Sequence, residues 1–157
     1  MFAKGTIEGV VTRPLVKFLD DRGWLTEIFR EDEIESRYMP VMGYISMTAA
    51  GIVRGPHEHV HQTDMFCFIG PSNFRVYLWD NRKNSPTYMT RQVLYAGEDA
   101  PKSVLVPPGV VHGYKNIGPG PGMVVNCPNR LFAGRGKREP VDEIRHEADP
   151  NTIFIVD

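Results

Sequence analysis

Three of the five histidines stand at alternate positions in one short stretch, Gly55-Pro56-His57-Glu58-His59-Val60-His61. In an extended strand alternate side chains share one face, so His57, His59 and His61 are predicted to point the same way. Imidazoles gathered in this way can transfer protons near neutral pH or bind a divalent metal ion. The spacing therefore favours a chemically active site over the alternative of purely structural histidines.

A further candidate, His112, follows the turn residues Pro107-Pro108-Gly109. Gly55 and Pro56 precede His57 in a similar way, and both residue types favour turns. We therefore expect two turns to bring His57 and His112 toward one pocket. His146 lies in a charged segment and is expected to be a solvated surface residue.

The elements that must position these histidines are predicted to be β-strands. Short apolar stretches separated by turn residues at near-regular spacing are typical of a sandwich or barrel. The chain has 15 Gly and 13 Pro, where average usage would give about 11 and about 8, and both residues disfavour helix interiors. Helix is expected only as a turn or two at 32–37 and 142–147. Strands are expected at 10–11, 15–18, 24–29, 44–48, 65–69, 74–79, 104–106, 123–125 and 153–156. The prediction is one all-β domain over residues 1–157.

Charge and cysteine content restrict the partners. A formal net charge of −1 provides no excess of positive charge for nucleic acid or an anionic membrane, so placed arginines must bind any anionic ligand. No secretory leader or membrane span is recognised in the sequence. Cys67 and Cys127 have apolar neighbours and are expected to be buried free thiols, which favours the cytoplasm. The aromatic residues Phe66, Phe68, Tyr77 and Trp79 are expected in the core.

The two histidine motifs resemble those of the cupins. The first has His57-x-His59 with Asp64 five residues beyond, and the second is Pro-x-Gly-x-x-His-x-x-x-Asn around His112. Cupins are small β jelly rolls whose strands enclose a pocket. In metal-dependent cupins the matching residues hold one divalent ion; here they are His57, His59, Asp64 and His112, with Asp64 at a glutamate position.

A narrower resemblance covers most of the chain. Its motifs occur in order at 20–27, 46–51, 52–57, 79–87, 107–114 and 144–150, among them Arg54-Gly55-Pro56-His57. The set resembles the dTDP-4-dehydrorhamnose 3,5-epimerase family, cupin-fold isomerases that need no metal cofactor. The resemblance implies a cupin jelly roll that forms a homodimer through its N-terminal strands.

The resemblance also implies a reaction in deoxysugar or surface polysaccharide biosynthesis. The substrate would be a nucleotide-diphosphate sugar with a 4-keto group, which acidifies the neighbouring C–H bonds so that a base can remove a proton. The family's base matches His57, and the aspartate that orients it matches Asp149. Arginines that bind the diphosphate match Arg22 and Arg54. Further pocket positions of the family match Glu27, Asp80 and His112.

The sequence departs from the family at two catalytic positions. Asp64 replaces the lysine that stabilises the enolate, and Leu131 or Phe132 replaces the tyrosine that returns a proton. A single epimerisation or a keto-isomerisation is therefore expected in place of double epimerisation. The acid would then be one of four candidates: Tyr44, Tyr114, His59 or His61.

Two other functions remain open on the sequence. A divalent ion such as zinc, held by His57, His59 and His112, could polarise the ketone as a Lewis acid. His57 cannot be both a ligand and a free base. The protein could also be a non-catalytic sugar-binding relative, because the family's lysine and tyrosine are replaced.

Several site candidates also have structural alternatives. Arg22 and Arg54 could form salt bridges with a carboxylate such as Asp20 or Glu27. Asp149 could make an Asx-turn before Pro150. Asp80 could form an ion pair with Arg82 within a turn.

Overall fold

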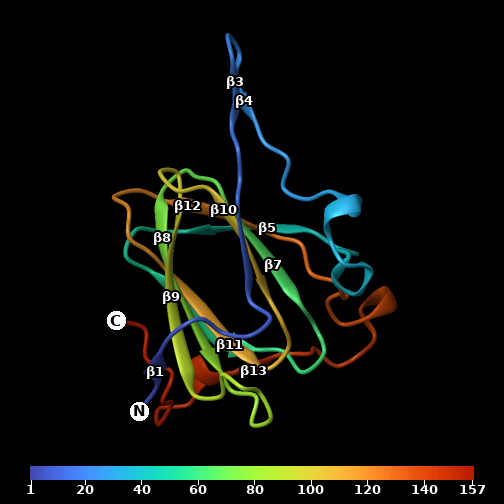
Figure 1. Cartoon of the computed structure of the whole chain (residues 1–157), viewed down its shortest axis with the longest axis vertical. Coiled ribbons are helices and arrows are strands. Elements are labelled where there is room, and N and C mark those ends of the chain that lie inside the picture. Colours follow the sequence, from blue (N-terminus) through green and yellow to red (C-terminus); the bar gives the residue numbers. More distant parts are fainter.

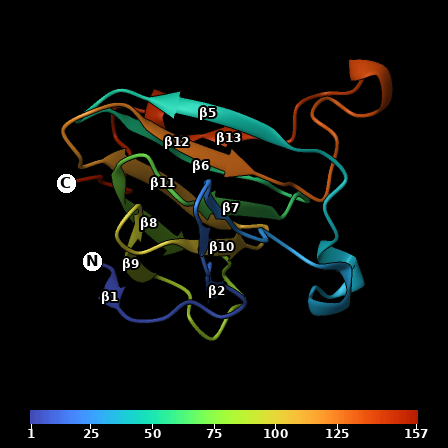
Figure 2. The same ribbon diagram turned by 90° about the horizontal axis from the view of Figure 1, so that it is seen from above.

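The computed structural model describes residues 1–157 and contains two β-sheets stacked as layers (Figures 1 and 2). One sheet has the strand order β1-β9-β8-β11-β6-β13, and the other has β2-β10-β7-β12-β5. The first comprises β1 (Ala3–Lys4), β6 (Val53–Glu58), β8 (Asn73–Asp80), β9 (Thr90–Gly97), β11 (Val110–Asn116) and β13 (Ile144–Arg145). The second comprises β2 (Val11–Pro14), β5 (Tyr44–Thr48), β7 (Asp64–Phe68), β10 (Lys102–Val106) and β12 (Gly122–Asn126). Consecutive strands repeatedly cross between the sheets, so the predicted all-β cupin jelly roll is confirmed.

Helical structure is limited to four 3₁₀ turns. They are η1 (Glu31–Glu33), η2 (Ser36–Tyr38), η3 (Arg135–Lys137) and η4 (His146–Ala148). The helical turn predicted within 142–147 is present only at its end, as η4, because residues 144 and 145 pair with β6 as strand β13. No helix has the length and apolar character needed to cross a membrane.

The main core lies between the two sheets and consists mostly of aromatic and β-branched side chains. Phe66 and Phe68 on β7 meet Val76 and Leu78 on β8 there, together with Tyr114 on β11. Tyr77 and Trp79 point to the opposite face of β8, because side chains alternate along a strand. There they pack against Phe154 of the C-terminal segment. The expected burial of these aromatic residues is confirmed, as are the two buried free cysteines.

One hairpin stands away from both sheets. Strands β3 (Phe18–Asp20) and β4 (Gly23–Leu25) pair only with each other and project from the body of the molecule (Figure 1). The predicted strand at 24–29 therefore ends at Leu25. The hairpin exposes apolar side chains, including Leu19 at 79% and Trp24 at 47%.

Candidate functional site

Four side chains from both sheets converge at one point. His57 lies on β6, His59 just after it, and His112 on β11, while Asp64 begins β7 in the opposite sheet. One ligand atom from each of the four lies within 4.8 Å of the others. The predicted convergence of His57, His59 and His112 is therefore present. His61 falls beyond the end of β6, in an exposed bend, so it does not continue the strand.

Close approach of β6 and β11 sets this geometry. His57 and His112 are register partners, and their rings lie 4.5 Å apart. Gly55 has φ +80, and a Cβ atom there would come 2.6 Å from the His112 carbonyl oxygen. Only glycine tolerates both conditions. The glycine before His57 thus permits the backbone contact that pairs the two histidines.

Asp142 fixes the turn that carries His59. Its carboxylate accepts hydrogen bonds from the backbone N–H groups of Val60, His61 and Gln62 at 2.8, 2.8 and 2.9 Å. Its own carbonyl oxygen contacts Nδ1 of His59. These bonds lower the pKa of the Asp142 carboxyl below its usual value, although partial burial acts in the opposite direction. Nothing in the sequence around Asp142 predicted this role, since its partners lie some 80 positions away.

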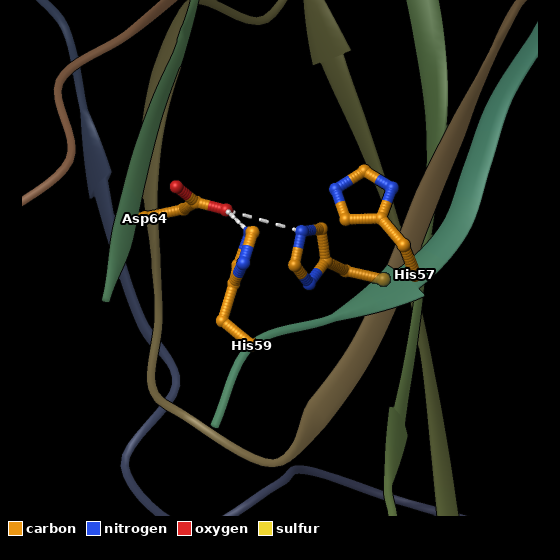
Figure 3. Close-up of side chains that lie close together, drawn as sticks. His57, His59 and Asp64 are labelled. Atoms are coloured by element: carbon orange, nitrogen blue, oxygen red, sulfur yellow. Dashed lines mark ion pairs between the residues drawn. The ribbon is translucent and has the colours of Figure 1, made fainter. Parts of the chain in front are cut away.

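The hydrogen bonds determine which nitrogens carry protons. A carbonyl oxygen only accepts, so Nδ1 of His59 must donate to Asp142, and Nδ1 of His112 must donate to Val110 O at 3.0 Å. In their neutral forms both rings therefore present a lone pair at Nε2. These Nε2 atoms lie 3.0 and 3.2 Å from Oδ2 of Asp64 (Figure 3). The buried Nε2 of His112 and Oδ2 of Asp64 complete no hydrogen bond of good geometry.

Nε2 of His59, Nε2 of His112 and Oδ2 of Asp64 are electron-rich atoms that meet in a buried site, and a positive charge between them would stabilise the arrangement. A proton on the imidazoles supplies it in the protein alone. Burial lowers the pKa of His59, yet the Asp64 carboxylate outweighs burial and leaves that pKa above its usual value. Burial disfavours the Asp64 anion, but His112 and His59 hold the Asp64 pKa well below its usual range.

His57 is the member that stays neutral. Its ring stands apart from the Asp64 contacts in Figure 3. Burial, followed by the charges of His112 and His59, lowers the His57 pKa to about 2. The nearest carboxylate to His57 is Glu143, whose Oε1 lies 3.8 Å from Nε2 of His57. His57 is thus neutral in the free protein, and Glu143 is the carboxylate closest to it.

A cavity of about 1260 Å³ opens above the cluster. His57, His59, Arg54 and Tyr44 line it, and the loop over residues 129–147 forms much of its wall. His112 and Asp64 do not line this cavity; they lie beneath it. The expected pocket role of His112 is therefore corrected, because its ring is buried against Asp64 and His57.

Arg54 is the predicted phosphate ligand that the structure brings to the cavity. Its Nε donates to Thr48 Oγ1 at 2.8 Å and an Nη donates to the Met47 carbonyl oxygen at 2.7 Å. Both acceptors are neutral and Arg54 forms no ion pair. Its charge therefore remains available to an anionic ligand at the cavity wall.

Four other predicted site residues lie outside the cavity of their own chain. Arg22 sits at the tip of the hairpin and pairs with Asp20. Glu27 follows the hairpin and pairs with Arg30 at 3.4 Å. The pair of Arg22 with Asp20 is the predicted structural alternative, whereas the pairing of Glu27 with Arg30 was not predicted.

Asp80 and Asp149 serve local structure as well. Asp80 is fully buried and accepts hydrogen bonds from Arg82, Ser85 and Thr87, which fold the loop after β8. Asp149 is exposed and accepts from the Asn151 N–H at 2.9 Å, an Asx-turn. It does not line the cavity; Glu147 is the last residue of this segment that does. Glu143 is the carboxylate that approaches His57, at 3.8 Å, and its other oxygen accepts a hydrogen bond from Arg145 Nε at 2.6 Å.

His146 also differs from expectation. Its Nε2 lies 2.8 Å from Oε1 of Glu58, on the opposite side of β6 from His57, and its ring packs on Phe154. Glu58 is buried and also accepts from Asn81 at 2.8 Å. His146 therefore anchors the C-terminal segment instead of lying on the solvated surface.

The donor set fits a divalent metal ion. Two imidazoles with Nδ1 bound to carbonyl oxygens present Nε2 lone pairs, and a carboxylate completes three ligands. His57 is near enough to be a fourth. Such a ligand set suits zinc, iron, manganese or nickel.

Comparisons with known proteins agree with this architecture. Residues 4–133 match the family model described as dTDP-4-dehydrorhamnose 3,5-epimerase. The chain is 34% identical to the spore coat polysaccharide biosynthesis protein SpsL of Bacillus subtilis, over 76% of this chain and 78% of that protein. It is 37% identical to the probable low-salt glycan biosynthesis epimerase Agl13 of Haloferax volcanii, over 80% and 81%.

Solved structures show the same fold. The dTDP sugar isomerase of Desulfovibrio desulfuricans G20 superposes with a TM-score of 0.77 at 23% identity, covering 88% of this chain and 84% of that one. NovW of Streptomyces spheroides, a 4-keto-6-deoxy sugar epimerase, gives 0.76 at 20% identity, covering 96% and 75%. With the family model matched over most of its length and two relatives above 30% identity, this chain belongs to the dTDP-4-dehydrorhamnose 3,5-epimerase family of isomerases.

Proposed function

We propose that this protein epimerises or isomerises a 4-keto nucleotide sugar in deoxysugar or surface-glycan biosynthesis. The observation that carries the proposal is the position of His57 in the wall of a large cavity that Arg54 also lines, with Glu143 Oε1 3.8 Å from Nε2 of His57. Relatives that make spore coat polysaccharide and low-salt glycan support the pathway class.

In the proposed reaction His57 removes the proton from the carbon next to the ketone. Charge builds up on the ketone oxygen as the C–H bond breaks, and a proton then returns to the other face of the carbon. Arg54 binds the diphosphate and fixes the sugar against His57, since a guanidinium fork suits phosphate oxygens. Glu143 orients the imidazole and stabilises it once it is protonated.

Deuterium exchange tests this function. The protein is incubated in D₂O with dTDP-4-keto-6-deoxy-D-glucose, and the sugar is followed by NMR. Wild type should incorporate deuterium next to the ketone, and His57→Asn should not. His146→Asn is the matched control, because this histidine lies on the other side of β6. No exchange by wild type, or full exchange by His57→Asn, would reject the proposal; a thermal shift with dTDP but no exchange would indicate a sugar-binding protein.

The cluster around Asp64 favours a second candidate, a metal-dependent cupin. His59, Asp64 and His112, with or without His57, would hold one divalent ion. A bound ion would polarise the substrate carbonyl as a Lewis acid. Metal analysis after purification without chelators distinguishes the two candidates. Near-stoichiometric metal that is lost in His59→Ala supports the second, and a metal-free active protein rejects it.

We also propose a homodimer that forms through the β3–β4 hairpin. An isolated two-stranded hairpin is marginally stable in water, so this one needs a covering surface. Its exposed Leu19 and Trp24 suit a second copy of the chain. In such a dimer Arg22 and Glu27 could serve the partner's cavity. The two free buried thiols support a cytoplasmic location.

A further inference from the structure

The proposed reaction needs an acid, and the segment expected to supply one holds Leu131 and Phe132. Neither side chain carries a proton that it can donate. Both line the cavity, so these two positions are at the site but provide no proton donor. The acid must therefore come from another element that faces His57.

Strand β5 is such an element. Tyr44, Ser46 and Thr48 alternate along it, and their hydroxyl groups meet partners in the interior of the jelly roll. β5 belongs to the five-stranded sheet, whereas His57 belongs to the six-stranded one. Both Tyr44 and His57 line the same cavity. A sugar bound between the sheets would present one face to each residue.

The hydrogen bonds of Asn126 show where the Tyr44 proton is. Oδ1 of Asn126 accepts from the Met65 N–H at 3.1 Å, which fixes the orientation of the amide. Nδ2 of Asn126 must then donate to Tyr44 Oη and to Asp64 Oδ1, both at 2.9 Å. The Tyr44 oxygen is therefore an acceptor in this contact. Its own O–H is uncommitted and free to turn into the cavity.

The other three candidate acids also line the cavity but are less suited. The Tyr114 hydroxyl shares a hydrogen bond with Ser46 Oγ at 2.9 Å, and its ring is buried among Phe66, Phe68 and Phe74. His59 has one nitrogen on Asp142 and the other facing Asp64. His61 lies in an exposed bend beyond β6.

We propose that Tyr44 is the catalytic acid that returns a proton to the substrate carbon, on the face opposite His57. This inference rests on the proposed epimerase or isomerase function. His57 takes the C–H proton and becomes an imidazolium, while the C–H electron pair forms the enolate. The Tyr44 O–H bond then breaks as a new C–H bond forms from the enolate pair, and the ketone is restored. Proton exchange with water returns His57 to its neutral form and Tyr44 to its phenol.

The surroundings of Tyr44 suit both protonation states. Burial raises the pKa of Tyr44 to about 12, with the nearby Asp64 and Glu143 charges acting in the same direction, so the phenol is protonated at neutral pH. The Nδ2 group of Asn126 would stabilise the transient phenolate by continued donation to Oη.

The test compares two readouts in Tyr44→Phe. Wild type and variant are incubated in D₂O with dTDP-4-keto-6-deoxy-D-glucose, and NMR follows both deuterium exchange and the configuration of the labelled carbon. In Tyr44→Phe we expect inversion to slow by about 100-fold or more. Exchange with retained configuration should continue, because His57 can return a solvent deuteron to the face it serves. Unchanged affinity for dTDP would verify the fold of the variant.

Two matched variants make the outcome decisive. Tyr95→Phe removes the same hydroxyl from an exposed position on β9, outside the cavity, and should invert at the wild-type rate. Tyr114→Phe tests the competing tyrosine. Inversion that persists in Tyr44→Phe, or that is lost in Tyr114→Phe alone, overturns the assignment. Loss of exchange as well as inversion in Tyr44→Phe would also overturn it, whereas absence of exchange in wild type removes the proposed function itself.

Discussion

His57 and His112 are register partners on neighbouring strands, with their rings 4.5 Å apart. The two histidines are in contact but lie at different depths below the surface. His112 is buried with Asp64 beneath the cavity, while His57 forms part of the cavity wall. Burial, followed by the charges of His112 and His59, lowers the pKa of His57, while the Asp64 carboxylate acts in the opposite direction. The buried histidines therefore tune the one that meets the substrate.

Gly55→Ala tests the backbone contact behind this pairing. A methyl group at φ +80 and 2.6 Å from the His112 carbonyl oxygen must displace β6 or β11. We expect a loss of about 2 to 4 kcal/mol in the free energy of unfolding, measured by urea denaturation. Gly51→Ala is the control, because φ is +74 there but a Cβ would meet no atom within 4 Å. It should lose only about 1 kcal/mol. Equal losses would mean that backbone strain alone matters.

Asp142→Ala tests the hydrogen bonds by which the Asp142 carboxylate holds the turn that carries His59. The change leaves three backbone N–H groups without their shared acceptor. Because some of these groups gain water instead, we expect a loss of about 1 to 3 kcal/mol in unfolding free energy. Asp99→Ala is the comparison, since that exposed carboxylate accepts one side-chain hydrogen bond from Asn73. A loss no larger than that of Asp99→Ala would contradict the role assigned to Asp142.

The sequence was sufficient to predict the fold and the convergence of the histidines. Turn residues at regular spacing and alternating apolar positions carry that information locally, as Phe66 and Phe68 on β7 illustrate. Asp142, Glu143 and Asn126 could not be found in this way. Their partners lie more than 60 positions away, so only the folded chain brings them to the site.

The predicted site residues that do not line the cavity of their own chain have local partners. Asp80 ends strand β8 and Arg22 lies in a turn, and in each case a side chain two residues away completes the hydrogen bonds. Motif position alone does not distinguish such a satisfied turn residue from a free ligand. Asp149 and Glu143 are six positions apart on a segment with little regular structure, so the sequence could not decide which carboxylate reaches His57.

Glu143→Gln tests the carboxylate assigned to His57. If Glu143 stabilises the protonated base, its neutral analogue should lower kcat by about 10-fold or more with a smaller change in KM. Steady-state kinetics with dTDP-4-keto-6-deoxy-D-glucose measures both. Asp149→Asn should have the smaller effect, because its carboxylate serves an Asx-turn. The reverse order would identify Asp149 as the partner of His57.

The buried Asp80 predicts a loss of stability in acid. Burial opposes its ionisation, but hydrogen bonds from Arg82, Ser85 and Thr87 dominate and lower the Asp80 pKa to about 2. The folded-state pKa thus lies below the unfolded value near 4, so the folded protein favours the anion. Asp80 therefore contributes about 2 kcal/mol above roughly pH 4, and this is lost as pH falls toward about 2. Urea midpoints of wild type and Asp80→Asn should converge over that interval, and a constant difference between them would contradict the assignment.

Substitutions in the β3–β4 hairpin test whether it joins two copies of the chain in the proposed dimer. Leu19 and Trp24 are register partners on β3 and β4, so their side chains share one face, and both are exposed in the single chain. If a second copy covers that face, each apolar side chain contributes about 1.5 kcal/mol or more to association. The double variant Leu19→Ser, Trp24→Ser should then weaken dimerisation by at least about 100-fold. Sedimentation velocity over a concentration series measures this, with Ile117→Ser as an exposed apolar control outside the hairpin. A monomeric wild type, or a double variant that remains dimeric, would show that the hairpin does not join two copies.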